Sequence, residues 1–581
     1  MNLRHTLYLV LVALCLTFAP PANSDTNDDS QKNNSIEWWR DAKFGLFVHW
    51  GPVSLVGTEI GWSRAGERRG TWRGPGHEVP VDIYDALYKT FNPIRFNPDE
   101  WVDIARGAGM KYLVFTSRHH DGFSMWDTKV SEYKITSPTS PYRRDIVRMI
   151  GDATRKGGLR FGVYYSQPDW HHPDAFTNRH NKFRTYLYEQ VKELMSDYGR
   201  IDILWFDGLG DRVHYEDDTA ALFEAKRIHP MARKLQPQIL INNRNGHPED
   251  FDTPEQRVGH MQIERPWESC ITIAQQWAWK PGDVLKSLDE LLGLLVTTVT
   301  GDGNLLLNVG PMPDGRIEPR QADRLRQMGD WLKENADAIY GTRGGPWVNG
   351  MWGGSTYRGN TIYVHLLRPA PGDRLRLAPL PHHILSAELH TRGALIKFTQ
   401  DNNGVTLMIP ETLYVSPVTI IKLTVAEPVA PGQKLGKTGG LFTDEVVFGH
   451  ALKHNVTARS SRGEPVQSSD GAWSVHIDNE RNLEVIFDLG RPRQLTGLYS
   501  VNAEPGTIKS HASLDVSLSV NGHEWQEVWR GSYGLPMWEI IFAKSGTTTS
   551  QEGNARFIRI RADYGNDAGS LSLKDTRIYA K

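Results

Sequence analysis

Short apolar runs alternate with helical patterns through the first three fifths of the chain. The runs that we expect to form strands span residues 44–49, 112–117, 160–166, 201–207, 239–243 and 304–309. Strands that alternate with helices in this way are typical of βα units, whose strands pair in parallel within one sheet. The pattern therefore predicts an α/β domain in this part of the chain.

Three of the intervening helices are indicated by apolar side chains at helical spacing, over about 98–108, 187–198 and 284–295. The first has Asn97 as a capping residue and Pro98 at its first position, both common at helix starts. The second stops at Gly199, and the third follows Asp283. About 300 residues of this alternation, over 35–345, favour a (β/α)₈-type (TIM-like) barrel. A doubly wound open sheet is the alternative, but no glycine-rich dinucleotide motif follows the first strand.

Beyond residue 345 the pattern changes to strands without helices. Expected strands over 361–367, 384–389, 404–409 and 418–425 predict a small antiparallel β-sandwich at 346–426. A stretch rich in Pro, Gly, Ala and Lys follows, and we assign 427–445 to a linker. A second all-β unit is predicted over 446–581, where Asn521-Gly522 indicates a hairpin.

The N-terminus has the features of a secretory signal peptide over residues 1–24. Arg4 precedes an apolar stretch over 7–19, and small residues stand before an expected cut after Ser24. We therefore expect a secreted or periplasmic protein without a transmembrane segment in its mature chain. Cys15 would be removed, so Cys270 alone would remain and no intrachain disulfide could form.

The overall charge is close to neutral, with a formal value of -2 at pH 7. This balance gives no electrostatic reason to expect nucleic acid or an anionic membrane as a partner. The chain has 19 tryptophans, and aromatic faces that stack on sugar rings are one use for such a surplus besides core packing.

Polar and aromatic residues gather at the carboxyl ends of the predicted strands, the end at which barrel enzymes build their active sites. They are His49, His119, His120, Tyr164, Tyr165 and Arg244. Two carboxylates occupy the same kind of position, Asp207 at the end of one strand and Glu255 after another. A carboxylate pair of this kind is the equipment of a glycoside hydrolase, although each residue alone could simply belong to a turn or face solvent.

The adjacent histidines His119 and His120 also raise the question of a metal site. Consecutive residues of an extended strand point to opposite faces, so joint chelation of one ion would need a bend. The chain contains no H-E-x-x-H motif and no cysteine cluster, so we expect no catalytic metal and no cofactor. A G-x-S-x-G nucleophile motif is also absent, which disfavours an esterase.

Taken together, the motifs over about residues 35–425 resemble glycoside hydrolase family 29, the retaining α-L-fucosidases. The matching segments are FGLFVHWG (44–51), SRHHDGF (117–123), YYSQPDW (164–170), WFDG (205–208), TPE (253–255), WE (267–268) and GNLLLNVGP (303–311). The resemblance implies that Asp207 is the nucleophile. It also implies that the fucose pocket is lined by His49, His119, His120, Tyr165, Trp205 and Arg244.

The resemblance identifies the general acid/base less directly. Glu255 is our assignment, Glu268 is the alternative, and Glu264 is a more distant third. Glu59 and Trp62 resemble an acidic and aromatic pair of the family's pocket, but the family's pair is adjacent in sequence and this one is not. A loop-packing role for Trp62 remains the alternative.

The last unit resembles a discoidin, or F5/8 type C, module, the fold of family 32 carbohydrate-binding modules. The matching segments are NVTA (455–458), DGAW (470–473), FDLG (487–490), NGHEW (521–525), ARFIR (555–559) and LSL (571–573). Such modules often hold a structural calcium ion, so the resemblance allows one in this unit. Trp473 and Trp525 are expected in the core rather than on a sugar-binding surface.

The sequence therefore predicts an exo-acting α-L-fucosidase that removes terminal fucose from oligosaccharides or glycoconjugates with retention. Two alternatives remain, a retaining glycosidase for another sugar and a glycan-binding protein on an inactive barrel. Residues 267–273 and 276–279 suggest the branch of the family that is selective for α-1,3/4 linkages.

Overall fold

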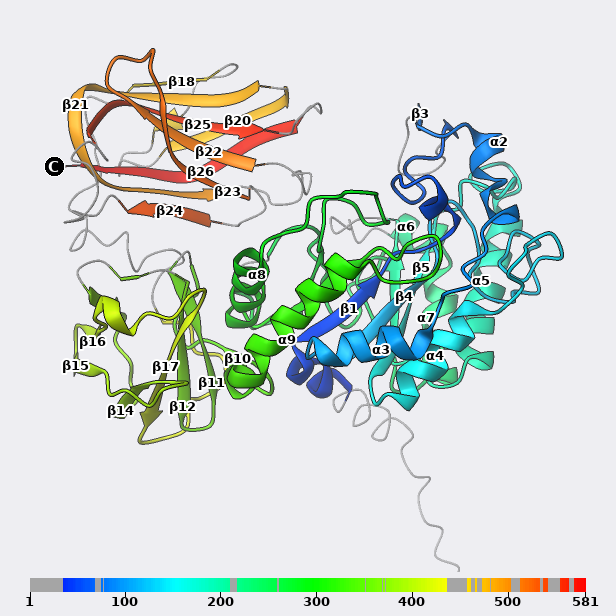
Figure 1. Cartoon of the computed structure of the whole chain (residues 1–581), viewed down its shortest axis with the longest axis horizontal. Helices are drawn as coiled ribbons and strands as arrows, with labels where there is room; N and C mark the ends of the chain where they lie inside the picture. Colours follow the sequence, from blue (N-terminus) through cyan, green and yellow to red (C-terminus); the bar gives the residue numbers. More distant parts are fainter. Residues whose placement is uncertain are drawn as a thin grey trace, which may run out of the picture.

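The computed structural model describes most of residues 35–435 and a set of strands beyond them (Figure 1). Within 35–435 the described residues exclude 68–74, 77, 209–216, 259–260, 351, 368 and 371–372. Beyond them the described segments are 457–460, 466–467, 473–480, 482–502, 513–532, 537–541, 554–563 and 569–580. The predicted signal peptide, 1–24, and the second half of the predicted linker lie outside the described residues.

A curled sheet of seven parallel strands forms the centre of the N-terminal domain, in the order β7-β6-β5-β4-β1-β9-β8. Its strands are β1 (Phe44–Val48), β4 (Tyr112–Arg118), β5 (Arg160–Ser166), β6 (Ile203–Asp207), β7 (Leu240–Ile241), β8 (Glu268–Thr272) and β9 (Asn304–Val309). Six of these coincide with the predicted strands, while β8 was missed. The strands follow one another in chain order around a ring, because the last strand, β9, pairs with the first, β1. This order confirms the barrel-like α/β architecture over an open doubly wound sheet.

The gap between β7 and β8 is bridged by residues 251–255. Isolated parallel bridges join Asn242 to Phe251 on one side, and Asp252 to Trp267 and Glu255 to Cys270 on the other. This short segment stands where an eighth strand would lie, and it carries Glu255 at its end.

Each strand of the barrel is buried on both faces. Successive side chains of a strand point to opposite faces, so alternate residues belong to two different environments. One set of side chains faces the inside of the barrel and forms a cluster of Phe47, Tyr112, Val114, Ile203, Tyr164, Trp205, Leu240, Cys270 and Leu306. Trp39 and Ala42 from before β1, and Phe251 from between β7 and β8, complete this cluster. The other set belongs to the large cluster between the strands and the helices, which includes Phe161, Val163 and Tyr165 of β5. Tyr164 and Tyr165 therefore belong to two different cores.

Helices cover the outside of the sheet (Figure 1). They are α3 (Pro98–Gly107), α4 (Ile146–Lys156), α5 (His180–Asp197), α6 (Asp217–Leu222), α7 (Ala225–Leu235), α8 (Leu288–Thr300) and α9 (Pro319–Ile339). The predicted cap of α3 is present, because the Asn97 side chain accepts a hydrogen bond from the Glu100 backbone N–H at 3.4 Å. The third predicted helix begins later than expected, since Ser287 caps α8 through the Glu290 N–H and Val284 is 64% exposed before it.

Short elements connect these parts. They are the turns η1 (Pro52–Leu55), η2 (Leu87–Lys89) and η4 (Glu411–Leu413), the helix α2 (Val81–Tyr84), and the strand pair β2 (Gly66–Glu67) and β3 (Pro75–Gly76).

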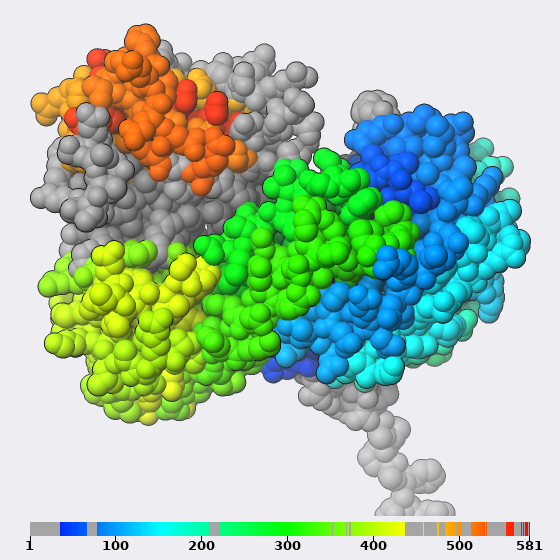
Figure 2. Space-filling model, in the orientation of Figure 1, coloured from blue at the N-terminus to red at the C-terminus, as the bar shows by residue number. Residues whose placement is uncertain are grey.

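Two antiparallel sheets follow the barrel and pack around a core of their own. The first consists of β10 (Arg343–Gly344), β11 (Gly353–Arg358), β12 (Thr361–Leu366), β17 (Thr419–Val425) and β14 (Ile384–Leu389). The second consists of β13 (Arg374–Leu377), β16 (Gly404–Met408) and β15 (Lys397–Asp401). Hydrogen bonds fasten this unit to the barrel's last helices, for example from Thr356 Oγ1 to the Ala338 carbonyl at 2.8 Å. Figure 2 shows its surface continuous with that of the barrel.

The described C-terminal residues form antiparallel strands around a third core. The strands are β18 (Thr457–Ser460), β19 (Val466–Gln467), β20 (Trp473–Glu480), β21 (Asn482–Asn502), β22 (Ser513–Ser519), β23 (Gln526–Ser532), β24 (Met537–Ile541), β25 (Asn554–Asp563) and β26 (Gly569–Ala580). The predicted hairpin is present as β22 and β23, connected by residues 520–525. Gly522 adopts a φ of 78° in that connection. Trp473 is buried in the core as expected, whereas Trp525 is only partly buried, with the Arg559 guanidinium over its ring.

No helix among the described residues is both long and apolar enough to cross a bilayer. Cys270 is a free, buried thiol on β8 inside the barrel.

Candidate active site

Asp207 is the last residue of β6, and the period of two places its side chain on the inner face with Ile203 and Trp205. The two oxygens of the carboxylate have different donors. The Arg244 guanidinium donates to Oδ1 at 2.8 Å, and the Tyr164 hydroxyl donates to Oδ2 at 2.8 Å. Two fixed donors therefore hold this carboxylate in one orientation at the carboxyl end of the barrel.

The charge state of Asp207 follows from opposing effects. Burial alone would raise its pKa, but the Arg244 guanidinium and the nearby His120 outweigh burial, and the pKa lies below the usual value for aspartate. The side chain remains ionised and 16% exposed. An ionised, aligned and accessible carboxylate has the properties of a nucleophile.

Arg244 connects the two predicted carboxylates. It follows β7, is 1% exposed, and is anchored by hydrogen bonds from Nε to Thr253 Oγ1 at 2.8 Å and from Nη2 to the Thr253 carbonyl at 2.9 Å. Its Nη1 donates to Asp207 Oδ1 and to Glu255 Oε2, each at 2.8 Å. Because one nitrogen contacts both oxygens, these lie at most twice that distance apart, about 5.6 Å.

Glu255 is the more accessible member of this carboxylate pair. It ends the segment that bridges β7 and β8, and its side chain is 36% exposed, against 16% for Asp207. The fold therefore places one shielded and one solvent-facing carboxylate on either side of the same guanidinium.

The other acidic residues considered as acid/base lie elsewhere. Glu268 is the first residue of β8 and is fully buried inside the barrel, below Trp205, so the structure argues against it as an acid/base beside Asp207. Glu264 forms an ion pair with Lys434 at 2.7 Å and does not contact the site.

Three histidines surround the carboxylates, and all are less than 5% exposed. His49 Nδ1 lies 2.7 Å from Asn308 Oδ1. The amide nitrogen of the same asparagine donates to the Trp277 carbonyl, which fixes the orientation of the amide. The Asn308 oxygen can only accept, so Nδ1 of His49 carries the hydrogen. Burial lowers the pKa of His49 to about 3, which leaves Nε2 as a neutral acceptor for a hydroxyl group.

His119 and His120 lie side by side, with ring centroids 4.1 Å apart. The strand β4 ends at Arg118, so His119 and His120 lie in the turn after it and not in an extended strand. This turn supplies the bend that two adjacent side chains need to face the same space. Burial holds the pKa of His119 well below its usual value. His120 Nδ1 is fixed by Ser166 Oγ at 2.7 Å, and its Nε2 lies 3.7 Å from Asp207 Oδ2.

Ligand atoms of His119, His120 and Asp207 come within 4.8 Å of one another, a spacing that could hold a metal ion. Asp207 already accepts hydrogen bonds from Arg244 and Tyr164, and a divalent cation there would stand close to the guanidinium charge. The arrangement therefore favours two imidazoles beside a nucleophile over a metal centre.

Glu59 and Trp62 lie on the loop after η1, at the rim of the site. The Glu59 carboxylate accepts hydrogen bonds from the backbone N–H groups of Ile60, Trp277 and Ala278, at 3.0, 2.9 and 3.1 Å. Burial raises its pKa to about 7, although these bonds oppose the shift. Trp62 meets His120 edge-on at 5.4 Å between ring centroids.

The assignment of Tyr165 to the pocket is wrong. Its hydroxyl donates to Gln190 of α5 at 3.0 Å, and its ring lies under the Arg118 guanidinium in the layer between sheet and helices. Tyr164 takes the inward position instead. The apolar run of β5 is buried on both faces, so its composition could not show which of the two adjacent tyrosines points inward.

Sequence reasoning also missed two other residues of the site. Asn308 lies on the inner face of β9 and orients His49. Trp277 is half-buried and lies beside His49, with ring centroids 4.7 Å apart. Only the order in which the strands meet brings Asn308 next to His49, 259 residues away in sequence.

Trp205 lies below the carboxylates rather than on an open wall, since it is 1% exposed. Its ring stacks on Tyr164 at 5.7 Å and an interplanar angle of 19°, and the Arg244 guanidinium lies 4.7 Å from its centre. The indole thus supports both residues that donate to Asp207.

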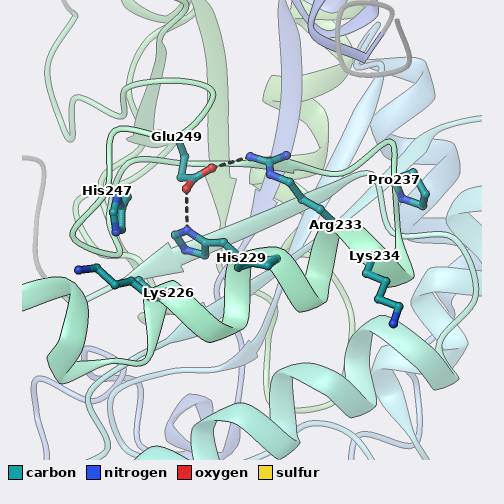
Figure 3. A pocket seen from close by; sticks show the side chains of 9 residues that line it. Lys226, His229, Arg233, Lys234, Pro237, His247 and Glu249 are labelled. Atoms are coloured by element: carbon teal, nitrogen blue, oxygen red, sulfur yellow. Dashed lines mark hydrogen bonds and ion pairs between the residues drawn. The ribbon is translucent and has the colours of Figure 1, made fainter. Parts of the chain in front are cut away.

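A separate cavity of about 670 Å³ opens on the outer face of the barrel beside α7 (Figure 3). The carboxylate of Glu249 in its lining accepts hydrogen bonds from His229 at 2.7 Å and from Arg233 at 2.5 Å. Burial alone would raise the pKa of Glu249, but these partners lower it to about 2. The described residues that line the cavity include no second carboxylate, so they do not reproduce the pair at Asp207.

Comparisons with known proteins agree with this geometry. A family model described as Alpha-L-fucosidase matches residues 10–337, more than half of the chain. The plasma alpha-L-fucosidase of Homo sapiens is 34% identical over 339 residues, which cover 52% of this chain and 69% of the relative. An alpha-L-fucosidase of Branchiostoma floridae is 30% identical, with 62% and 85% covered.

Solved structures give the same result. The structure of alpha-L-fucosidase isoenzyme 1 from Paenibacillus thiaminolyticus superposes with a TM-score of 0.60 and 33% identity, and the match covers 68% of this chain and all of that one. The crystal structure of the Thermotoga maritima alpha-fucosidase gives a TM-score of 0.55 and 26% identity, with 68% and 99% covered. This chain belongs to the alpha-L-fucosidase family.

Proposed function

We propose that this protein is an exo-acting α-L-fucosidase that hydrolyses terminal α-L-fucosyl linkages with retention of configuration. The observation that carries the proposal is the guanidinium nitrogen of Arg244, which contacts both Asp207 and Glu255 at 2.8 Å. It limits the two oxygens to about 5.6 Å. Retaining glycosidases separate their carboxyl groups by about 5–5.5 Å, whereas inverting enzymes need about 6.5–9.5 Å to admit a water.

The mechanism has two displacements. In the first, Asp207 Oδ attacks the anomeric carbon, the glycosidic C–O bond breaks, and protonated Glu255 gives its proton to the departing oxygen. In the second, Glu255 takes a proton from water, the hydroxide oxygen attacks the anomeric carbon, and the ester bond to Asp207 breaks. The sugar leaves with its original anomeric configuration, and both carboxyls return to their starting states.

The surrounding residues fit a single terminal sugar unit. His49, His119 and His120 are neutral or fixed imidazoles that can hydrogen-bond ring hydroxyls, and the half-buried rings of Trp62 and Trp277 border them. An apolar ring surface suits the C5 methyl group of fucose. The low exposure of the histidines favours a small closed pocket over a long cleft.

The nucleophile is tested with Asp207→Gly and azide. The variant is expected to lose nearly all turnover of an aryl α-L-fucoside, because no carboxylate attacks the anomeric carbon. Azide can enter the vacated space and attack from the same face, so the expected product is the inverted β-L-fucosyl azide. Full turnover in the folded variant without azide would refute Asp207 as nucleophile.

The acid/base is tested with Glu255→Gln, and Glu268→Gln serves as the matched control. Loss of the acid affects leaving groups that need a proton, so Glu255→Gln should impair a fucosyl disaccharide far more than a dinitrophenyl fucoside. Glu268→Gln should preserve the ratio between the two substrates. The reverse result would transfer the role to Glu268.

Two other functions compete with this proposal. A retaining glycosidase for another sugar would prefer a different aryl glycoside, so the α-L-fucoside is compared with the β-D-galactoside. A glycan-binding protein on an inactive barrel would bind fucose without turnover. The paired carboxylates and the ionised state of Asp207 favour the enzyme over the binding protein.

Three further features of the chain extend the proposal beyond the catalytic site. We propose a discoidin-like carbohydrate-binding role for the antiparallel strands beyond residue 456, with a structural calcium ion, on the motifs that they share with such modules. Export to the periplasm or medium rests on the signal-like residues 1–24. Selectivity for α-1,3/4 linkages rests on residues 267–273 and 276–279, and Trp277 of the latter lies beside His49. Hydrolysis of defined α-1,2, α-1,3, α-1,4 and α-1,6 fucosides would test it.

A further inference from the structure

A carboxyl group that the proposed mechanism does not use lies inside the barrel. Glu268 is fully buried at the first position of β8, and Asp207 is at the last position of β6. Both oxygens of Glu268 accept hydrogen bonds, one from the Tyr112 hydroxyl and the other from the Trp205 indole Nε1 at 3.1 Å. A buried carboxyl is costly to retain in an apolar core.

Trp205 lies between Glu268 and the proposed nucleophile. One edge of the indole donates to Glu268, its face stacks on Tyr164, and the Arg244 guanidinium lies 4.7 Å from its centre. Tyr164 and Arg244 are the two residues that donate to the two oxygens of Asp207. A tilt of the indole would therefore displace both donors together.

We propose that Glu268 is a positioning residue that fixes the tilt of Trp205 and thereby aligns Tyr164 and Arg244 on Asp207. This inference rests on the proposed function of the same site. Burial also raises the pKa of Glu268 to about 7 despite its two donors, so the carboxyl is largely protonated in mildly acidic solution. Its role as an acceptor persists in that state, because a protonated carboxyl retains a carbonyl oxygen.

The test compares Glu268→Met with Glu268→Gln. Methionine is similar in size and unbranched but accepts no strong hydrogen bond, whereas glutamine keeps an oxygen for the Trp205 N–H. Asp202→Asn is the matched control, since Asp202 is also buried, binds the Phe161 N–H and Arg200, and lies just before β6 away from Asp207. Thermal unfolding of each variant reports the loss of stability separately.

The expected result is a fall in kcat of about tenfold or more for Glu268→Met, with KM changed little because Trp205 is 1% exposed. Glu268→Gln should stay within about threefold of the parent, and Asp202→Asn should keep its kcat even where it unfolds at lower temperature. In the double variant with Tyr164→Phe, the losses should be smaller than the product of the single losses, because both act on the same donor.

Three results would overturn the inference: an unchanged kcat in Glu268→Met, an equal loss in Asp202→Asn of matched stability, or losses that multiply with Tyr164→Phe. If Glu268→Met does not fold, Trp205→Phe tests the same link by removing the indole N–H, and an unchanged kcat there would also overturn it. Failure of the proposed function is distinguishable, because the parent enzyme itself would then leave the fucoside intact.

Discussion

Replacement of Tyr164 by phenylalanine removes one oxygen atom and tests how the nucleophile is held. The Tyr164 hydroxyl is buried and donates to Asp207 Oδ2 at 2.8 Å, while the ring stacks on Trp205. Phenylalanine keeps the ring and its stacking, so the change isolates the hydrogen bond. Tyr165→Phe is a matched control, because it removes the same group from the next residue, where the hydroxyl donates to Gln190 at 3.0 Å.

The magnitude follows from the charge of the acceptor. A hydrogen bond to a charged group contributes about 1.5–3 kcal/mol, roughly twice that of a neutral pair. If the bond is needed to hold Oδ2 in line with the anomeric carbon, its loss costs about 10-fold to 150-fold in kcat/KM. Loss of a donor to the ionised form also raises the pKa of Asp207, so the acid limb of the profile should move to higher pH.

The assay is kcat/KM for an aryl α-L-fucoside from about pH 2.5 to 8, so that the acid limb set by the lowered pKa of Asp207 falls within the range, with thermal unfolding as a check on folding. Tyr164→Phe should show both the loss and the shifted acid limb. Tyr165→Phe should lose stability without either change, since its hydroxyl faces α5. Equal losses in the two variants, or a larger loss in Tyr165→Phe, would refute the assignment of the inward tyrosine.

Three further predictions concern charge and metal. In Arg244→Met the guanidinium charge is gone and burial dominates the pKa of Asp207, which should rise. The acid limb of the kcat/KM profile should then move to higher pH, and an unmoved limb would contradict the electrostatic role of Arg244. Glu268 has a pKa of about 7 in the folded protein against 4.5 for the free side chain, so its stabilising effect is complete below about 4.5 and is lost as the pH rises through 7. The loss in the free energy of unfolding amounts to roughly 3 kcal/mol. Glutamine does not titrate, so the unfolding temperature of Glu268→Gln should fall less than that of the parent between pH 5 and 8. An equal fall in the two proteins would show that the carboxyl does not titrate in this range. Dialysis against EDTA should leave fucoside turnover unchanged, because carboxyls carry out both displacements, whereas a loss that divalent ions reverse would point to a metal.

Much of the fold could be predicted from sequence, because local signals and burial agree there. The runs of β5, β9 and β14 were placed at the residues where the structure has them. β8 was missed, since its residues Glu268–Thr272 include one acid, two hydroxyl groups and one thiol and do not form an apolar run. The structure buries them because each of these polar side chains has a partner: Trp205 across the barrel for Glu268, the Arg257 carbonyl for Ser269 and the Ala274 carbonyl for Thr272.

Part of the candidate site could also be predicted from the sequence. Strand ends concentrate functional side chains, so Asp207, His49 and Arg244 could be found from their position after an apolar run. Position after a strand could not decide whether Glu268 or Glu255 is the general acid/base. Both are acids beside strand residues, and only the three-dimensional structure shows that one faces solvent beside Arg244 while the other lies below Trp205.

The sequence by itself determined most of the succession of strands and helices, the family to which the chain is similar, and the residue types available at the strand ends. These depend on local composition and on spacing along the chain. The tertiary structure decided which of two adjacent tyrosines faces Asp207, which glutamate shares the Arg244 guanidinium, and which asparagine orients His49. Those choices depend on strand register and on contacts between residues up to 259 positions apart, which a parallel strand buried on both faces does not reveal in its own sequence.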